Sequence, residues 1–378
     1  MYIPYGTQWI EEEDIQAVVD TLRSDYLTTG PKVKEFEEKV ATYVGAKYGV
    51  AVANGTAALH LACMAAGIKQ GDEVITSPIT FAASANCVLY CEGTPVFSDV
   101  DRETYNISPA AIRKNITKKT KAIIPVHYTG QPCEMDEIHQ IAKEHNLCVI
   151  EDAAHALGAE YKGKKVGGLS DMTCFSFHPV KHITTCEGGM ITTNNRELYE
   201  KLKLLRSHGI TREEENLEKE EGSWYYEQQI LGYNYRISDV QCALGISQMN
   251  RIETFVERRQ EIAAYYNENL KNIEGLVLPY QKEGCQSSWH LYVIRVKGEV
   301  RKEIFEKLRE AEIGVNVHYI PVYKHPYYQK NGYQNVYCRE AEELYRGIIS
   351  IPMYPKLTKD QQDDVIQKIK NIFFITSQ

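Results

Sequence analysis

Residues 135–152, MDEIHQIAKEHNLCVIED, decide the fold because they join a helix to a short apolar strand. Apolar residues recur at helical spacing from Met135 to His145, and the β-rich run 147–150 then ends in Glu151-Asp152. A helix that leads directly into a short buried strand is part of a βαβ unit. The stretch therefore predicts a parallel sheet with an acidic pair at the carboxyl end of one strand.

The same alternation of strand and helix extends on both sides of this stretch. Two amphipathic helices are predicted first, over 15–22 and 33–44. Short strands are then predicted at 48–53, 73–76, 94–98, 122–126, 171–177 and 189–193, and helices at 56–66, 109–115 and 196–207. The pattern predicts an α/β fold in which helices cover both faces of a parallel sheet.

The C-terminal third is predicted to form a second domain. Residues 238–259 are expected to form one long helix that connects the domains. Strands are expected at 289–296 and 315–318, and helices at 301–311 and in the tail. We therefore expect a large domain over 1–250, with an N-terminal arm, and a small α+β domain over 251–378. The charged run 211–221 is predicted to be a solvated loop.

Composition argues against several classes of protein. The 378 residues include 43 Lys and Arg against 51 Asp and Glu, a net charge of −8, so no basic surface for nucleic acid or an anionic membrane is expected. The first residues do not resemble a secretory signal, and the uncharged stretch 75–91 is too polar to span a bilayer. Ten scattered cysteines without a CxxC pair indicate reduced thiols and a cytoplasmic location.

Asn54-Gly55-Thr56 lies where an expected strand ends and an expected helix begins. Unpaired N–H groups and the positive end of the helix dipole can hold a phosphate at such a turn. The alternative is an ordinary helix capped by Thr56. No dinucleotide fingerprint is present, and the P-loop-like run 158–165 has Lys165 where Ser or Thr is required, so we interpret that run as a turn.

Asp152 and Lys181 are the strongest candidates for chemistry. A carboxylate at the end of a buried strand needs a cationic partner, and α/β sheets bind ligands at that edge. Lys181 lies in a short uncharged loop after the strand 171–177, where a lysine can have a lowered pKa and form a Schiff base. Together with a phosphate-binding turn, this pair suits pyridoxal phosphate. A structural aspartate and a surface lysine are the alternative.

The sequence gives little support to a metal site or to a hydrolase site. His178 and His182 have the spacing of a metal pair on a helix, but Pro179 between them argues against a helix. The spacing provides no third ligand, so no metal site is predicted. A Ser/His/Asp hydrolase has no GxSxG motif to support it.

Six motifs are spread over nearly the whole chain: Gly55-Thr-Ala-Ala-Leu59, Ser77-Pro-Ile-Thr-Phe81, Glu151-Asp-Ala-Ala-His-Ala156, Ser176-Phe-His-Pro-Val-Lys181, Glu187-Gly-Gly189 and Gly232-Tyr-Asn-Tyr-Arg-Ile237. They resemble motifs of the DegT/DnrJ/EryC1/StrS family of sugar aminotransferases. The resemblance implies a fold-type-I pyridoxal-phosphate-dependent transferase, whose large domain has a mainly parallel sheet between helices and binds the cofactor. A smaller α+β C-terminal domain is implied over 251–378.

The resemblance also implies roles for individual residues. Lys181 would bind pyridoxal 5′-phosphate as a Schiff base and move protons, and Asp152 would keep the pyridine nitrogen protonated. Some relatives have His in place of the lysine and dehydrate sugars, so Lys181 favours transamination. The implied cofactor-binding residues are Gly55, Thr56, Phe81, Asp152, His155, Ser176, Lys181 and Asn234.

Two of these residues, His155 and Asn234, carry further implications. His155 stands where Gln is more usual, and it can still form a hydrogen bond to the ring hydroxyl. Asn234 is similar to a family asparagine that reaches the phosphate from the partner subunit. The resemblance therefore implies a homodimer with shared active sites.

A closer resemblance is to the 4-aminotransferases of the pseudaminic acid pathway. It rests on Tyr5-Gly6, Leu27-Thr28, Phe175-Ser-Phe-His178, Lys181-His-Ile-Thr-Thr185, Arg206-Ser-His-Gly209 and Asn316-Val-His-Tyr-Ile-Pro-Val-Tyr323. The implied reaction moves an amino group from L-glutamate to C4 of a UDP-linked 4-keto-6-deoxy-N-acetyl-hexosamine. The implied substrate-binding residues are Tyr5, Asp25, Tyr26, Leu27, Thr28, Thr56, Ser176, Asn234, Asn316, Val317, His318 and Tyr319.

Other interpretations stay open from the sequence. The same fold could act on a dTDP-linked sugar or on a C3 ketone, or could bind a nucleotide sugar as a non-catalytic sensor. His318-Tyr319 could be a strand end that packs under the small domain, and Tyr5 could be an arm residue at a dimer interface.

Overall fold

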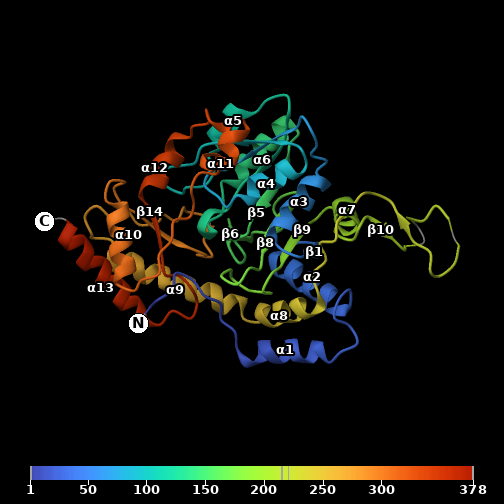
Figure 1. Ribbon diagram of the computed structural model, residues 1–378, viewed down its shortest axis with the longest axis horizontal. Helices are drawn as coiled ribbons and strands as arrows, with labels where there is room; N and C mark the ends of the chain where they lie inside the picture. The colour runs from blue at the N-terminus through green and yellow to red at the C-terminus, as the bar shows by residue number, and fades with distance from the viewer. Residues whose placement is uncertain (1, 214–215, 220, 377–378) are drawn as a thin grey trace.

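The computed structural model describes residues 2–213, 216–219 and 221–376 (Figure 1). Its centre is a seven-stranded sheet in the order β1-β9-β8-β5-β4-β2-β3. Strand β9 is antiparallel to both of its neighbours, and the other strand pairs are parallel. The mainly parallel sheet predicted from the sequence is confirmed. Its strands are β1 (Tyr48–Val52), β9 (Gly189–Thr193), β8 (Met172–Ser176), β5 (Cys148–Asp152), β4 (Thr120–Ile124), β2 (Glu73–Thr76) and β3 (Thr94–Phe97).

Helices cover both faces of this sheet because successive strand residues are apolar and point to opposite sides. In β5, Ile150 packs with α3 (Gly55–Ala65), α4 (Ala83–Tyr90) and α7 (Arg196–Arg206). Its neighbour Val149 packs on the other side with α5 (Pro109–Asn115) and α6 (Met135–His145). Helices α2 (Pro31–Val44) and α8 (Asp239–Met249) complete that second side. The doubly covered α/β fold is confirmed.

The C-terminal part has its own hydrophobic core. Helices α9 (Ile252–Leu270), α10 (Arg301–Glu310) and α13 (Lys359–Thr376) pack around the antiparallel pair β13 (Tyr292–Arg295) and β14 (Ile348–Ile351). Helix α12 (Arg339–Gly347) and the short α11 (Pro326–Tyr328) pack instead against the large-domain residues Phe97 and Tyr105. This contact joins the C-terminal part of the chain to the large domain. The boundary at 250/251 stays a prediction.

The prediction of one helix over 238–259 is wrong, because α8 ends at Met249 and α9 begins at Ile252. Arg251 between them leaves the helical conformation, and its guanidinium bonds to the carboxylate of Asp14. Ser247 and Gln248 donate to the same carboxylate at 2.6 and 2.7 Å. Helix α8 is thereby held against α1 (Glu12–Leu22), while α9 continues into the small domain (Figure 1).

The strand predicted at 315–318 is also wrong, because only an isolated bridge joins Asn316 to Ser350. The side chain of Asn316 accepts the next backbone N–H, that of Val317, at 2.8 Å, and this local bond competes with a regular ladder. The ring of His318 bonds to the Ser350 hydroxyl at 2.7 Å instead. The segment therefore leaves the sheet and reaches the large domain.

Helix α1 forms as predicted, but its apolar stripe does not face the core. Ile15 and Leu22 are 49% and 56% exposed, whereas Asp14 and Thr21 are buried. The contact with α8 is made through the polar network of Asp14, so the apolar side of α1 remains at the surface.

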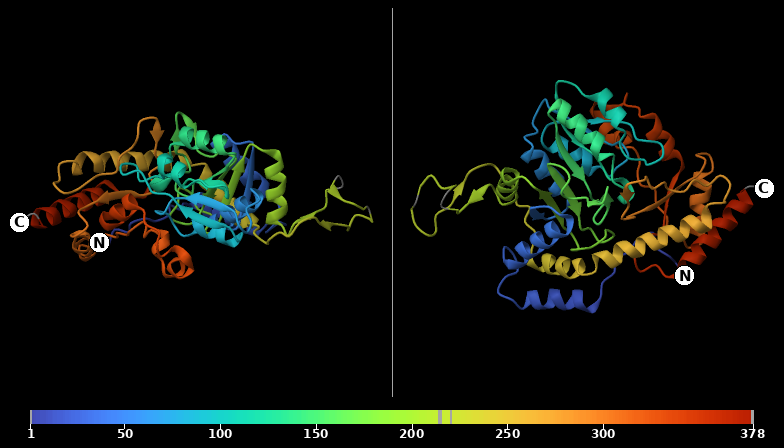
Figure 2. Two further views of the ribbon diagram at one scale, coloured as in Figure 1. Left: turned by 90° about the horizontal axis from the view of Figure 1, so that it is seen from above. Right: turned by 180° about the vertical axis from the view of Figure 1, so that it is seen from behind.

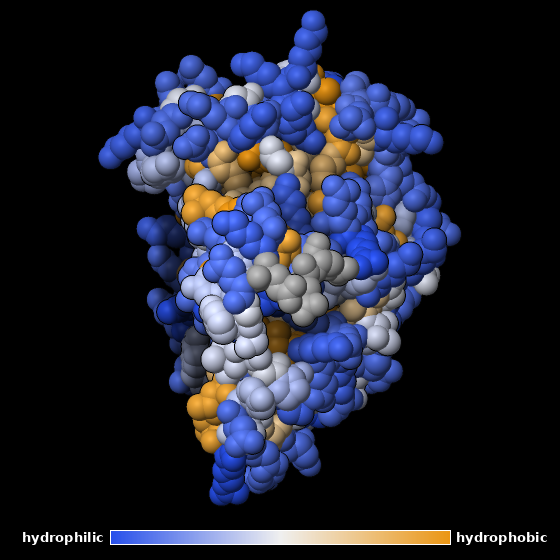
Figure 3. Space-filling view, turned by 90° about the vertical axis from the view of Figure 1, so that its right-hand side faces the viewer, coloured by the Kyte–Doolittle hydropathy of each residue, from blue (hydrophilic) through white to orange (hydrophobic). Residues whose placement is uncertain are grey.

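A long extension leaves the body of the molecule after α7 (Figures 1 and 2). It contains the antiparallel pair β10 (Ile210–Thr211) and β11 (Glu227–Gln228). The predicted solvated loop 211–221 belongs to it, but residues 214, 215 and 220 lie outside the described residues. Seen end-on, the face from which it projects is mostly hydrophilic with separate hydrophobic patches (Figure 3).

A small second sheet joins β12 (Cys285–Gln286), β6 (Glu160–Tyr161) and β7 (Lys164–Lys165). The β6–β7 hairpin confirms that the P-loop-like run is a turn. All ten cysteines are free thiols, as expected. Within the described ranges, no helix has both the length and the apolar character needed to cross a membrane.

Candidate active site

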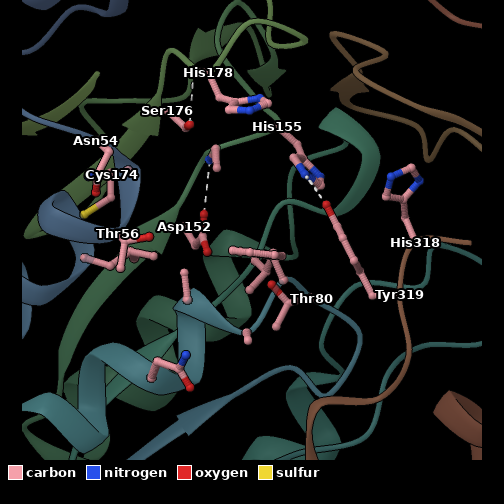
Figure 4. Close-up of a pocket in the computed structure, with 18 of the residues that line it drawn as sticks. Asn54, Thr56, Thr80, Asp152, His155, Cys174, Ser176, His178, His318 and Tyr319 are labelled. Carbon is pink, nitrogen blue, oxygen red and sulfur yellow. Dashed lines mark hydrogen bonds between the residues drawn. The ribbon is translucent and has the colours of Figure 1, made fainter. Parts of the chain in front are cut away.

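A cavity of about 1110 Å³ lies at the carboxyl ends of β5 and β8, between the large domain and the segment 316–328. Figure 4 shows Asp152 between the start of α3 and the chain that bears His318 and Tyr319. Twelve residues predicted from the sequence line this cavity: Tyr5, Gly55, Thr56, Phe81, Asp152, His155, Ser176, Lys181, Asn316, Val317, His318 and Tyr319. The structure thus brings most of the predicted site together.

Asp152 is the last residue of β5 and is 5% exposed. Its backbone N–H donates to the Pro125 carbonyl at 2.9 Å, and its carbonyl accepts from the His127 N–H at 3.1 Å. These backbone bonds to the segment after β4 fix the position of Asp152. Its carboxylate accepts hydrogen bonds from the Ser84 hydroxyl at 2.6 Å and from the Ala154 N–H at 3.1 Å. These two donors fix the position of the buried carboxylate at the edge of the cavity.

Lys181 follows β8 in a turn closed by its own N–H, which donates to His178 at 2.9 Å. Burial lowers the pKa of its amine to about 8, Asp152 opposes that shift, and Arg259 adds to it. A lysine that loses its proton near neutral pH is a nucleophile for carbonyl groups. The prediction of a lowered lysine pKa is supported by this burial.

The first turn of α3 borders the same cavity (Figure 4). Asn54 caps the helix, because its side-chain oxygen accepts from the Ala57 N–H at 2.8 Å, so the alternative of a Thr56 cap is wrong. Gly55 lies directly against Ser176, where an added Cβ would be 2.9 Å from the Ser176 Cβ. The helix start and two hydroxyl side chains, Thr56 and Ser176, thus form a small corner of the kind that can hold an anion.

Histidine and tyrosine side chains line the opposite wall. His155 Nε2 is 3.1 Å from the Tyr319 hydroxyl, as the dashed line in Figure 4 marks. Burial, and then the charge of Lys181, hold the pKa of His155 well below its ordinary value. Burial likewise lowers the pKa of His318 to about 4. These imidazoles are therefore neutral near pH 7 and act as hydrogen-bonding groups rather than as cations.

Five predicted residues do not line this cavity: Asp25, Tyr26, Leu27, Thr28 and Asn234. They lie close together on another part of the same chain. Leu27 accepts the N–H of Asp239 at 3.0 Å, Thr28 bridges to Ser238, and Asn234 bridges to Ser207. Tyr26 and Leu27 are 57% and 48% exposed. Their roles remain predictions.

Several residues of the site were not predicted from the sequence, and three of them lie near Asp152 and Lys181. Ser84 holds Asp152, His290 lies 3.4 Å from the Lys181 amine, and Arg259 is buried behind both. Ser84 is 68 residues from Asp152 in the chain, and no spacing rule links them. A lone histidine in the strand-like run 289–296 was the one available signal for His290.

A half-buried lysine near a buried aspartate, at the carboxyl ends of a mainly parallel sheet and beside a corner that can hold an anion, defines a fold-type-I transferase. Comparison with known proteins identifies the family within this class. Residues 8–370 match the DegT/DnrJ/EryC1/StrS aminotransferase family. The chain belongs to this family and is an aminotransferase.

Three similar proteins illustrate the match. A UDP-4-amino-4,6-dideoxy-N-acetyl-beta-L-altrosamine transaminase from Campylobacter jejuni is 40% identical over 381 residues, which cover 97% of this chain and 98% of the relative. PseC from Helicobacter pylori, an aminotransferase involved in the biosynthesis of pseudoaminic acid, superposes with a TM-score of 0.92 at 33% identity, covering 99% and 100% of the two chains. The PLP-form of Spr1654 from Streptococcus pneumoniae gives 0.92 at 32% identity, covering 99% of each.

Proposed function

We propose that this aminotransferase uses pyridoxal 5′-phosphate to move an amino group from L-glutamate to C4 of a UDP-linked 4-keto-6-deoxy-N-acetyl-hexosamine, in pseudaminic acid biosynthesis. The observation that carries the proposal is the pair of buried Asp152 and half-buried Lys181 beside the corner at Gly55 and Ser176. The names of the Campylobacter and Helicobacter relatives support the sugar and the pathway.

The residues present fit the cofactor. Gly55, Thr56 and Ser176 would hold the phosphate, since the helix start favours an anion and a Cβ at position 55 would fill the corner. Asp152 would pair with the pyridine nitrogen, and His155 with the ring hydroxyl. When bound, the cofactor supplies an electron sink for the carbon that loses its proton.

The chain's own groups supply the remaining steps. Lys181, with a pKa of about 8, can release and take up a proton near neutral pH. Ser84 and Ala154 fix the Asp152 carboxylate, which would pair with the ring nitrogen of the bound cofactor and favour its protonated form. The inner wall of the cavity includes the buried side chains of Asp152, His155 and His290, and burial strengthens the interaction between charges there.

The cavity is larger than the cofactor alone requires. Its far end is lined by Leu89, Tyr90, Ile320 and Tyr327, with the polar side chains of Asn86 and His325 among them. Apolar and aromatic walls with a few polar groups suit a nucleotide-linked sugar. Asn316 to Tyr319 lie between this end and Asp152, where the keto sugar would bind.

We propose a homodimer whose sites are shared. The chain supports this in two ways: the predicted residues Asp25 to Thr28 and Asn234 lie outside the cavity of their own chain, and the apolar side of α1 is exposed. A second copy related by a twofold axis would cover such a surface and bring these residues to the other cavity.

The test is an assay of UDP-linked and dTDP-linked 4-keto sugars side by side with purified protein. The protein should be yellow, should aminate the UDP-linked sugar faster, and should lose both properties in Lys181→Ala. A colourless protein that binds no pyridoxal phosphate contradicts the cofactor assignment. A preference for the dTDP-linked sugar contradicts the substrate assignment alone.

A further inference from the structure

A group of buried histidines lies behind Lys181. His290 Nε2 is 3.4 Å from Lys181 Nζ. The centroid of its ring is 4.4 Å from that of His155 and 5.8 Å from that of His182. Burial, followed by the nearby positive charges, holds the pKa of all three histidines well below the ordinary range. All three imidazoles are therefore uncharged at neutral pH.

A neutral imidazole has one nitrogen that donates and one that accepts. His290 Nε2 faces the Lys181 amine, which is a donor whether or not it is protonated. His290 Nδ1 is buried and has no hydrogen-bond partner within the described chain. A buried nitrogen without a partner is destabilising, so its presence calls for a functional reason. The contact of Nε2 with the Lys181 amine provides that reason, because an Nε2 that accepts leaves the proton on Nδ1.

Arg259 on α9 lies on the far side of His290 and is 1% exposed. Its Nη1 donates to the backbone carbonyls of Trp289 and His290 at 3.1 Å and to that of Met353 at 3.0 Å. Across the described residues, no carboxylate forms an ion pair with it. The guanidinium therefore fixes the backbone that bears the His290 ring and places an unbalanced positive charge behind the lysine.

We propose that His290 and Arg259 are a positioning pair for Lys181: His290 accepts a hydrogen bond from the amine and orients it toward the cavity, and Arg259 fixes the backbone that bears His290 and supplies a positive charge on its far side. The proposal rests on the proposed function, because it assumes that the Lys181 amine reacts with a carbonyl. The titratable and charged groups that influence the amine, or are influenced by it, are Asp152 from β5, His155 after it, His182 in the lysine loop, His290, His318 and, on the far side of His290, Arg259.

The role of His290 is tested with His290→Phe, which keeps a ring but no acceptor, and His290→Gln, whose side-chain oxygen can accept. His60→Gln is the matched control, since His60 is also buried with an unpartnered Nε2 but does not line the cavity. The measurement is the rate at which pyridoxal phosphate added to the folded apoprotein produces Schiff-base absorbance. We expect about a tenfold slower rate in His290→Phe, substantial recovery in His290→Gln, and no change in the control.

The role of Arg259 is tested without the cofactor. Competitive labelling of the apoprotein with an amine reagent across pH, with the Lys181 peptide quantified by mass spectrometry, gives the pKa of this one amine. Arg259→Gln removes a positive charge, so the Lys181 pKa should rise by about one unit, while Arg259→Lys should stay near wild type.

Two results would overturn the proposal: an unchanged Schiff-base rate in His290→Phe, or an unchanged Lys181 pKa in Arg259→Gln. If Arg259→Gln does not fold, the Schiff-base rates of the His290 variants decide whether the proposal stands. If His290→Phe also fails to fold, His290→Leu replaces it. If the wild type itself forms no Schiff base, the proposed function fails, and the labelling experiment still judges the positioning pair on its own.

Discussion

At the scale of single residues, the chemistry depends on how burial changes the charge of Lys181. The pKa of about 8 lies below the ordinary lysine value of 10.5. At pH 7.5 about a quarter of the amine is then uncharged, against about one part in a thousand for an exposed lysine. Binding of pyridoxal phosphate to the apoprotein should therefore accelerate as pH rises and level off above about 8. Stopped-flow absorbance measures this, and a midpoint near the ordinary lysine value would contradict it.

Asp152 depends on its neighbour Ser84, which is fully buried and donates to the carboxylate at 2.6 Å. Asp152→Ala should fold but transaminate at least about a hundredfold more slowly, because the ring nitrogen loses its partner. Ser84→Ala leaves one carboxylate oxygen without a donor, and about tenfold slower turnover is expected. Steady-state kinetics on the folded variants decides. If Ser84→Ala were slower than Asp152→Ala, Ser84 would need a role of its own.

At the scale of elements, the contact between α3 and the end of β8 shapes the phosphate corner. Gly55→Ala would put a Cβ 2.9 Å from the Cβ and 3.2 Å from the hydroxyl of Ser176. The two segments must then separate, and we expect pyridoxal phosphate to bind about tenfold more weakly or worse. Fluorescence titration measures the affinity, and the melting temperature is the control for folding. Unchanged affinity would remove Gly55 from the corner.

Sequence reasoning predicted the sheet well because its strands are short apolar runs with clear boundaries, such as 73–76 and 189–193. It failed where tertiary contacts decide. The break between α8 and α9 depends on Arg251 meeting Asp14, which is 237 residues away in the chain. The outward stripe of α1 follows from the same polar network. Tertiary packing brings Ser84, His290 and Arg259 to the site, and no local sequence pattern predicts that placement.

At the scale of the whole molecule, each proposed site is completed by residues from two chains. Lys181→Ala and Asn234→Ala should each be inactive or strongly impaired alone. If Asn234 acts in the partner's site, unfolding and refolding the two variants together in equal amounts should restore about a quarter of wild-type activity, because half of the dimers carry one intact site. Activity that stays absent after mixing, in preparations shown to be mixed dimers, would place Lys181 and Asn234 in the same chain's site or in no common site.

The central claim is that Lys181 and Asp152 support transfer of an amino group to a UDP-linked 4-keto sugar. The most direct measurement combines the purified protein, pyridoxal phosphate, ¹⁵N-labelled L-glutamate and the UDP-linked 4-keto-6-deoxy-N-acetyl-hexosamine, and analyses the sugar product by mass spectrometry and NMR. We predict a product with ¹⁵N at C4, formed by the wild type and absent with Lys181→Ala. A sugar recovered without the label, from protein that binds both the cofactor and the sugar, would contradict the account.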